Sequence, residues 1–63
     1  MIIARKSIHA AFELKKGHQL QESDLIMKRP GDGISPMLMH QVIGKTILED
    51  LIADTKLNWK HFR

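Results

Sequence analysis

Hydrophobic positions in the first half of the chain indicate two short strands separated by turns. The opening segment "IIARKSIHAAFEL" shows an imperfect alternation at Ile8, Ala10 and Phe12, which predicts a strand. The next segment, "KKGHQ", predicts a turn in which Gly17 takes a positive φ angle. The segment "ESDLIMKR" then predicts one tight turn followed by a brief strand from Leu25 to Lys28.

The second half begins with the strongest helix signal in the chain. Ser35 suits a helix N-cap, Pro36 suits the first helical position, and Gly44 suits the C-terminal cap. The body between them, "MLMHQVI", allows about two turns. Three apolar residues of this helix share one face at helical spacing: Met39, Val42 and Ile43. After Gly44 we expect a strand in "KTILEDL", a turn in "IADTK" and an apolar close in "LNWKHF".

An internal repeat relates the two halves. The segments "ELKKGHQLQESDL" and "DLIADTKLNWKHF" align without gaps, and their apolar positions coincide: Leu14 with Leu51, Leu20 with Leu57, and Leu25 with Phe62. Gly17 aligns with Asp54, and aspartate is among the few other residues that tolerate the left-handed region. The repeat predicts two similar halves related by a pseudo-two-fold, each closing the core of the other. A chance match of three apolar positions is the alternative.

Length and composition limit what the chain can be. Its 63 residues allow one small domain, which we assign to residues 1–63. The chain has no cysteine, so it forms no disulfide, and this suits a reducing cytoplasm. Domains of this size usually depend on a disulfide, a metal or a neighbour, and a neighbouring domain or subunit is the support that we expect here.

Several other classes of site or partner are not supported by the sequence. The four histidines lack the spacing of a helical metal pair: His9, His18, His40 and His61. No apolar run approaches the roughly 20 residues of a membrane span. Ten basic and seven acidic residues give a net charge of +3 and are interspersed, so nucleic-acid binding is not expected.

The segment "KRPGDGISP" places two glycines and two prolines around a few polar side chains. Pro30 favours an extended backbone at Arg29. Gly31 and Gly33 allow φ values that other residues avoid, so the loop could pass close to another surface. Asp32 can accept backbone N–H bonds and fix the loop. The loop would then present the planar, five-donor guanidinium of Arg29. The alternative is a tight connector in which Arg29 is only a solvated charge.

Four segments point together to a known family: "RKSI" at 5–8, "KKG" at 15–17, "KRPGDGISPM" at 28–37 and "VIGK" at 42–45. In their order and spacing they resemble the C-terminal SAF, or antifreeze-like, domain of bacterial sialic acid (N-acetylneuraminate) synthases. The resemblance covers essentially the whole chain. It implies a mostly β, small β-clip fold of the type III antifreeze kind. That fold has short strands, one short helix, 3-10 turns and an internal pseudo-two-fold.

The resemblance also implies a role within a larger cytoplasmic transferase. That enzyme condenses phosphoenolpyruvate with N-acetylmannosamine in a barrel that lies N-terminal to this domain and holds a divalent metal, manganese or magnesium. In a domain-swapped homodimer the SAF domain caps the partner's barrel, where Arg29 contacts the N-acyl group of the sugar. The residues that would shape the loop are Pro30, Gly31, Asp32, Gly33, Ser35 and Pro36. We expect no catalysis, cofactor or metal in this domain alone.

Two alternatives remain open. Synthases for legionaminic and pseudaminic acids carry similar domains, and the ending Ile34-Ser35-Pro36 favours the sialic and legionaminic type. A free-standing ice-binding protein would share the fold. Ice binding requires a flat, weakly charged face, whereas the corresponding turn here is polar: Lys15, Lys16, His18, Gln19, Gln21 and Glu22.

The sequence also predicts where three further side chains lie. Leu38 either forms an exposed apolar patch that marks contact with the barrel or completes the small core. His40 is expected on the surface near a helix C-terminus. Trp59 is expected as an anchor of the core or of an interface rather than as a platform for sugar stacking.

Overall fold

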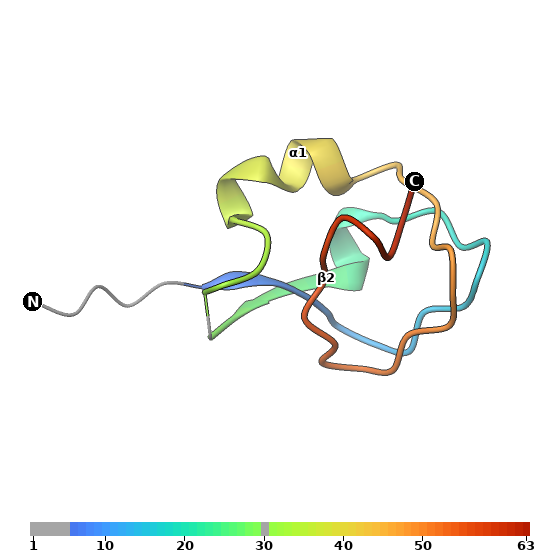
Figure 1. Ribbon diagram of the computed structural model, residues 1–63, viewed down its shortest axis with the longest axis horizontal. Coiled ribbons are helices and arrows are strands. Elements are labelled where there is room, and N and C mark those ends of the chain that lie inside the picture. Colours follow the sequence, from blue (N-terminus) through green and yellow to red (C-terminus); the bar gives the residue numbers. More distant parts are fainter. Residues whose placement is uncertain (1–5, 30) are drawn as a thin grey trace, which may run out of the picture.

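A two-stranded antiparallel sheet and one short helix are the regular elements of the computed structural model, which describes residues 6–29 and 31–63 (Figure 1). In chain order the elements are β1 (Ser7–Ala10), the 3-10 turn η1 (Glu22–Asp24), β2 (Leu25–Lys28), the 3-10 turn η2 (Pro36–Leu38) and α1 (Met39–Val42). The predicted order of strand, tight turn, strand and short helix is therefore confirmed.

Strand β1 is hydrogen-bonded along both edges, so all four of its residues are buried. On one edge it pairs with β2 in the register Ser7 with Lys28, Ile8 with Met27, His9 with Ile26 and Ala10 with Leu25. On the other edge Leu57 N donates to Ile8 O at 3.0 Å, and Ala10 N donates to Thr55 O at 2.9 Å. A short strand with partners on both sides is the centre of this fold.

The predicted alternation in the first strand fails at Phe12. The strand ends at Ala10, the chain bends at Ala11 and Phe12, and the Phe12 residue is 56% exposed. The Ala11 N–H donates to Asp24 O at 2.8 Å, which turns the chain across the end of the sheet. Burial in β1 therefore comes from its two bonded neighbours rather than from a single covered face.

The predicted helix consists of a 3-10 turn that continues into one α-helical turn. Ser35 caps its start, because its Oγ accepts from Met37 N at 3.2 Å, and Pro36 occupies the first position as predicted. Gly44 follows the last turn with φ 92°, also as predicted. On the predicted face, Val42 is buried and Met39 packs against the core, but Ile43 is exposed, so that part of the prediction is wrong.

The strand predicted in "KTILEDL" is not formed. The chain bends at Leu48 and Glu49, and the segment makes only isolated bridges with three parts of the chain: Thr46 with Gln19, Ile47 with Phe62, and Leu51 with Leu14. The bend is fixed because Leu48 N donates to His61 O at 2.9 Å. An apolar run therefore contacts three neighbours in turn instead of following one.

The predicted pseudo-two-fold is present in the backbone hydrogen bonds, which repeat at the offset of 37 residues that separates Leu14 from Leu51. These two residues bond to each other in both directions, at 2.8 and 2.7 Å. Other bonds form equivalent pairs: Gly17 N to Ile47 O (2.7 Å) with Asp54 N to Ala10 O (2.8 Å), and Leu20 N to Lys45 O (2.7 Å) with Leu57 N to Ile8 O (3.0 Å). In these pairs each bond from the first half to the second is matched by one in the return direction, as a two-fold exchange requires.

The core lies between the two halves and draws on both. Its buried hydrophobic residues are Ile8, Ala10, Leu14, Leu20, Leu25, Ile34, Val42, Ile47, Leu51, Leu57 and Phe62. All three apolar pairs of the sequence repeat are among them. Three partly buried residues pack against this cluster: Met27, Leu38 and Met39. Of the two expectations for Leu38, the one in which it completes the core is therefore confirmed.

Gly17 and its equivalent Asp54 both take positive φ angles, of 90° and 68°. A methyl group added at Gly17 would meet no atom within 4 Å, so substitution there strains only the backbone. We expect Gly17→Ala to lower the free energy of unfolding by about 1–2 kcal/mol in urea denaturation followed by circular dichroism.

The matched control for this variant is Gly17→Asn, because asparagine tolerates the left-handed region. It should lose much less stability than Gly17→Ala. Equal stability of the alanine variant and the parent chain would contradict a positive φ at this turn.

Candidate functional site

Arg29 lies immediately after β2, where the chain bends, and it is exposed to solvent. Within residues 6–29 and 31–63 its guanidinium makes no hydrogen bond or ion pair. Pro30, which was expected to shape the backbone at this point, lies outside the described residues. The structure thus places a cation with no internal partner in the described chain at the start of the "RPGDG" loop.

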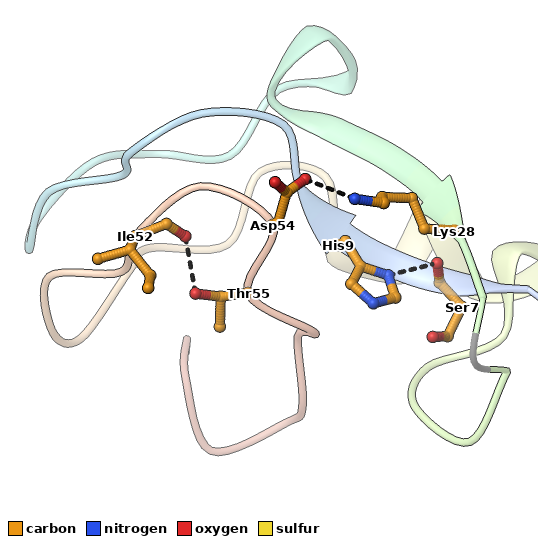
Figure 2. Close-up of polar contacts among 6 residues, drawn as sticks. All are labelled: Ser7, His9, Lys28, Ile52, Asp54 and Thr55. Carbon is orange, nitrogen blue, oxygen red and sulfur yellow. Dashed lines mark hydrogen bonds and ion pairs between the residues drawn. The ribbon is translucent and has the colours of Figure 1, made fainter.

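The residue before Arg29 is held by an ion pair. Lys28 Nζ donates to Asp54 Oδ1 at 2.8 Å, as Figure 2 shows. The side chain of Lys28 is 41% exposed and that of Asp54 is 64% exposed. The hydrogen bond from Lys28, and then its positive charge, lowers the pKa of Asp54.

The residue on the other side of the loop is held by a second ion pair. Lys56 Nζ donates to Asp32 Oδ1 at 2.7 Å, and this bond is the main cause of a lowered pKa at Asp32, followed by the aspartate's own backbone N–H. We expected Asp32 to accept hydrogen bonds from backbone N–H groups of the loop. Its long-range partner Lys56 was not foreseen, because 24 residues separate the two.

Gly33 is needed for close packing rather than for a left-handed backbone. Its φ angle is not in the positive region, which corrects the expectation for this position. A methyl group there would lie 2.9 Å from Lys56 Cγ and 3.2 Å from the carbonyl oxygen of Leu57. The loop does pass close to another segment, as predicted, but that segment is the C-terminal half of the same chain.

The turn that supplies both ion-pair partners is fixed by hydrogen bonds. The Thr55 hydroxyl donates to Ile52 O at 2.7 Å (Figure 2), and Asp54 N donates to Ala10 O at 2.8 Å. Ile8 N donates to Ile34 O at 3.0 Å, which joins the far end of the loop to the same strand, β1. The loop and the turn are therefore both hydrogen-bonded to strand β1.

His9 is a buried polar residue beneath this region, and we expected no role for it from the sequence. It is 5% exposed, and its Nδ1 lies 3.0 Å from the carbonyl oxygen of Ser7, so that nitrogen carries a proton (Figure 2). Its charge, when it is protonated, lowers the pKa of both Asp32 and Asp54. Burial within a strand that is paired on both edges is a long-range property, and no local sequence signal reports it.

A groove runs beside the loop and has a volume of about 540 Å³. It is lined by Lys6, Gly31, Gly33, Ser35, Pro36 and Met37. Four of the six residues expected to shape the loop therefore line one hollow. Met37 is 84% exposed at its edge and offers an apolar contact next to the cationic loop.

A second hollow lies near the C-terminal end of α1 and includes Trp59. Trp59 is 48% exposed and packs edge-to-face on Phe62, with ring centroids 5.6 Å apart, so it does not belong to the core. The expectation that it anchors an interface is left as a prediction. His40 is exposed at this hollow, as expected.

Within residues 6–29 and 31–63, no three histidine or acidic side chains gather closely enough to hold a metal ion. No helix in these described ranges has the length and apolar content to span a membrane.

Comparison with known proteins places this geometry among related domains. The sequence pattern described as the SAF domain matches residues 5–63. The chain is 39% identical over 59 residues, 94% of its length, to an N,N'-diacetyllegionaminic acid synthase of Legionella pneumophila. It is 44% identical over 52 residues, 82% of its length, to the protein of that name from Campylobacter jejuni. The chain spans 17% and 16% of the length of these two relatives.

A solved structure shows the same fold. An antifreeze protein like domain in human N-acetylneuraminic acid phosphate synthase matches with a TM-score of 0.90 and 20% sequence identity. The match covers 95% of this chain and 77% of the human one. The resemblance and the antifreeze-like fold predicted from the sequence are therefore confirmed.

The ion pairs of the loop make a testable prediction about pH. Because the pKa values of Asp32 and Asp54 are lowered, both carboxylates stay ionised down to their folded-state pKa, and the two bonds are lost only as the pH falls through it, below about pH 4. NMR titration of the two carboxyl carbons should place both midpoints below the ordinary aspartate value of about 3.9.

Removing each lysine provides the control. In Lys56→Met the midpoint of Asp32 should rise toward the ordinary value while that of Asp54 stays low, and Lys28→Met should give the reverse. Ordinary midpoints in the parent chain would show that the two ion pairs do not form in solution.

Proposed function

The chain belongs to the SAF domain family, and we propose that it is the C-terminal, substrate-capping domain of a cytoplasmic nonulosonic acid synthase. In this proposal the catalytic barrel precedes the domain and condenses phosphoenolpyruvate with an N-acylated mannosamine-type sugar. The divalent metal, manganese or magnesium, belongs to the barrel, and no residue of this chain is assigned to it. The domain covers the barrel of the partner subunit in a domain-swapped homodimer.

The observation that carries the proposal is the placement of Arg29. An exposed guanidinium with no partner among the described residues follows a strand end and lies between two residues that are each held by an ion pair. A guanidinium donates two N–H bonds from a rigid plane, so it can hold the carbonyl oxygen of an N-acyl group and stays charged at any working pH. Such a residue on a fixed loop positions a substrate with little loss of conformational entropy.

The N-acyl sugar is the substrate class that best suits Arg29. Two relatives are named N,N'-diacetyllegionaminic acid synthases, and they favour a diacetylated sugar as the first substrate to test, with N-acetylmannosamine and a pseudaminic acid precursor next. The barrel would select among these sugars, while Arg29 would contact the N-acyl group that they share.

Ice binding is the alternative function from another class, and the fold match to an antifreeze-like domain gives it a reason to be tested. The turn that would face ice exposes Lys15, Lys16, His18, Gln19, Gln21 and Glu22. Charged groups hold their hydration water strongly, so this face does not suit ice. We expect no thermal hysteresis from the 63-residue chain in a freezing-point assay, and a measurable hysteresis would favour the alternative.

The proposed role of Arg29 is tested by Arg29→Ala in the full-length synthase. A hydrogen bond from a charged group contributes about 1.5–3 kcal/mol, so kcat/KM for the N-acyl sugar should fall by about 10- to 100-fold. The KM for phosphoenolpyruvate should stay within about twofold, because the guanidinium is assigned to the sugar alone. Steady-state kinetics with each substrate varied in turn measures both.

Two variants make the result specific. Arg63→Ala removes another exposed guanidinium from the same domain and should leave the kinetics unchanged. Arg29→Lys keeps the charge but not the planar fork, so it should recover only part of the activity. Parent-like kinetics of Arg29→Ala would contradict the proposed function.

A further inference from the structure

We propose that Asp54 and Lys56 are positioning residues that hold the Arg29 loop in register, by binding it with opposite charges on its two sides. The inference rests on the proposed function, because it concerns how the loop presents its guanidinium to the sugar. The groups involved are two ion pairs, Lys28–Asp54 and Asp32–Lys56, at 2.8 and 2.7 Å.

Both partners of the loop come from one short stretch of chain. Asp54 and Lys56 are two residues apart, where the chain leaves the turn at residues 53–54. One binds the residue before Arg29, and the other binds Asp32 on the far side of the loop. The guanidinium therefore projects from a segment that is held on both sides.

The stretch that holds the loop is itself anchored to the central strand. Leu57 N donates to Ile8 O, Ala10 N donates to Thr55 O, and Asp54 N donates to Ala10 O. The backbone at Asp54 has φ 68°, the left-handed conformation of the turn at residues 53–54. Displacement of the backbone that carries the two charges would require these bonds to β1 to break.

The arrangement of signs selects one register. In the observed pairing each lysine faces an aspartate. If the loop moved along the turn in one direction, Lys28 would face Lys56, and if it moved in the other, Asp32 would face Asp54; either contact would be repulsive. If both lysines came from one segment and both aspartates from the other, a shifted loop would still find attractive partners, and the charges would not select a register. The close approach of Gly33 to Lys56, which leaves no room for a methyl group at residue 33, adds a steric limit on the same side.

These ion pairs matter for position far more than for stability. The four side chains are between 39% and 67% exposed, and exposed pairs contribute little to the free energy of unfolding. A shift of about 1 Å in the residue that contacts the substrate, in contrast, weakens that contact. Loss of the ion pairs should therefore impair use of the sugar in a protein that remains folded.

The test uses Asp54→Asn and Lys56→Met in the full-length synthase. Asparagine tolerates the positive φ of residue 54, and methionine keeps Cγ of residue 56 and has an uncharged side chain of similar shape, so each variant removes mainly the charge. Each should raise the KM for the N-acyl sugar by about two- to fivefold and both together by about five- to twentyfold, with kcat and the thermal midpoint nearly unchanged.

A second background separates this inference from the proposed function. In Arg29→Ala enzyme, the two substitutions should have no further effect on KM, because the residue that they position is gone. If Arg29→Ala alone leaves the kinetics unchanged, the proposed function fails. If Arg29→Ala raises KM while Asp54→Asn and Lys56→Met do not, the positioning role is overturned and the proposed function stands.

A control variant and a charge exchange test whether the effect is specific to these ion pairs. Glu13→Gln breaks an exposed ion pair with Lys15 on another turn, at 3.5 Å, and should change nothing. The exchange Asp32→Lys with Lys56→Asp reverses the second pair and should restore KM relative to Lys56→Asp alone. A KM that stays high in the exchanged variant would overturn the proposed pairing.

Discussion

The fold depends on backbone hydrogen bonds exchanged between two similar halves. The described chain has a single two-stranded sheet, yet bonds between the halves link β1 to residues 55–57 and, in the equivalent place, residues 18–20 to 45–47. Because each half supplies partners that the other lacks, neither can bury its apolar residues alone. A chain of 63 residues without disulfides thereby gains one shared core.

The candidate site lies where the two halves differ. Asp54 and Lys56 occupy the positions equivalent to Gly17 and Gln19, which carry no charge. The symmetric scaffold thus fixes the backbone of both turns in the same way, and only the C-terminal turn binds the loop at Arg29. One copy of a repeated turn therefore carries the charged side chains, and the repeated backbone hydrogen bonds hold that turn in place.

Local and self-similar features could be read from the sequence, whereas long-range contacts could not. The left-handed turn at Asp54 was predicted because it aligns with Gly17, and the cap at Ser35 follows from local rules. The strand expected after Gly44 was wrong, because bridges to three distant segments decide that region. The burial expected of Phe12 was wrong, because the bond from Ala11 N to Asp24 O turns the chain before that residue. The partner of Asp32 lies 24 residues away, and no local pattern identifies it.

A small domain of this kind has reason to fix its loop with charges rather than with apolar packing. The core is already shared between both halves, and the loop at Arg29 must stay accessible if it is to meet a substrate. Apolar packing would hide the loop, but ion pairs at its two sides restrain the backbone and leave the guanidinium in solvent. Weak surface interactions that add little stability are then well suited to orientation, because orientation requires only that one arrangement be preferred over its neighbours.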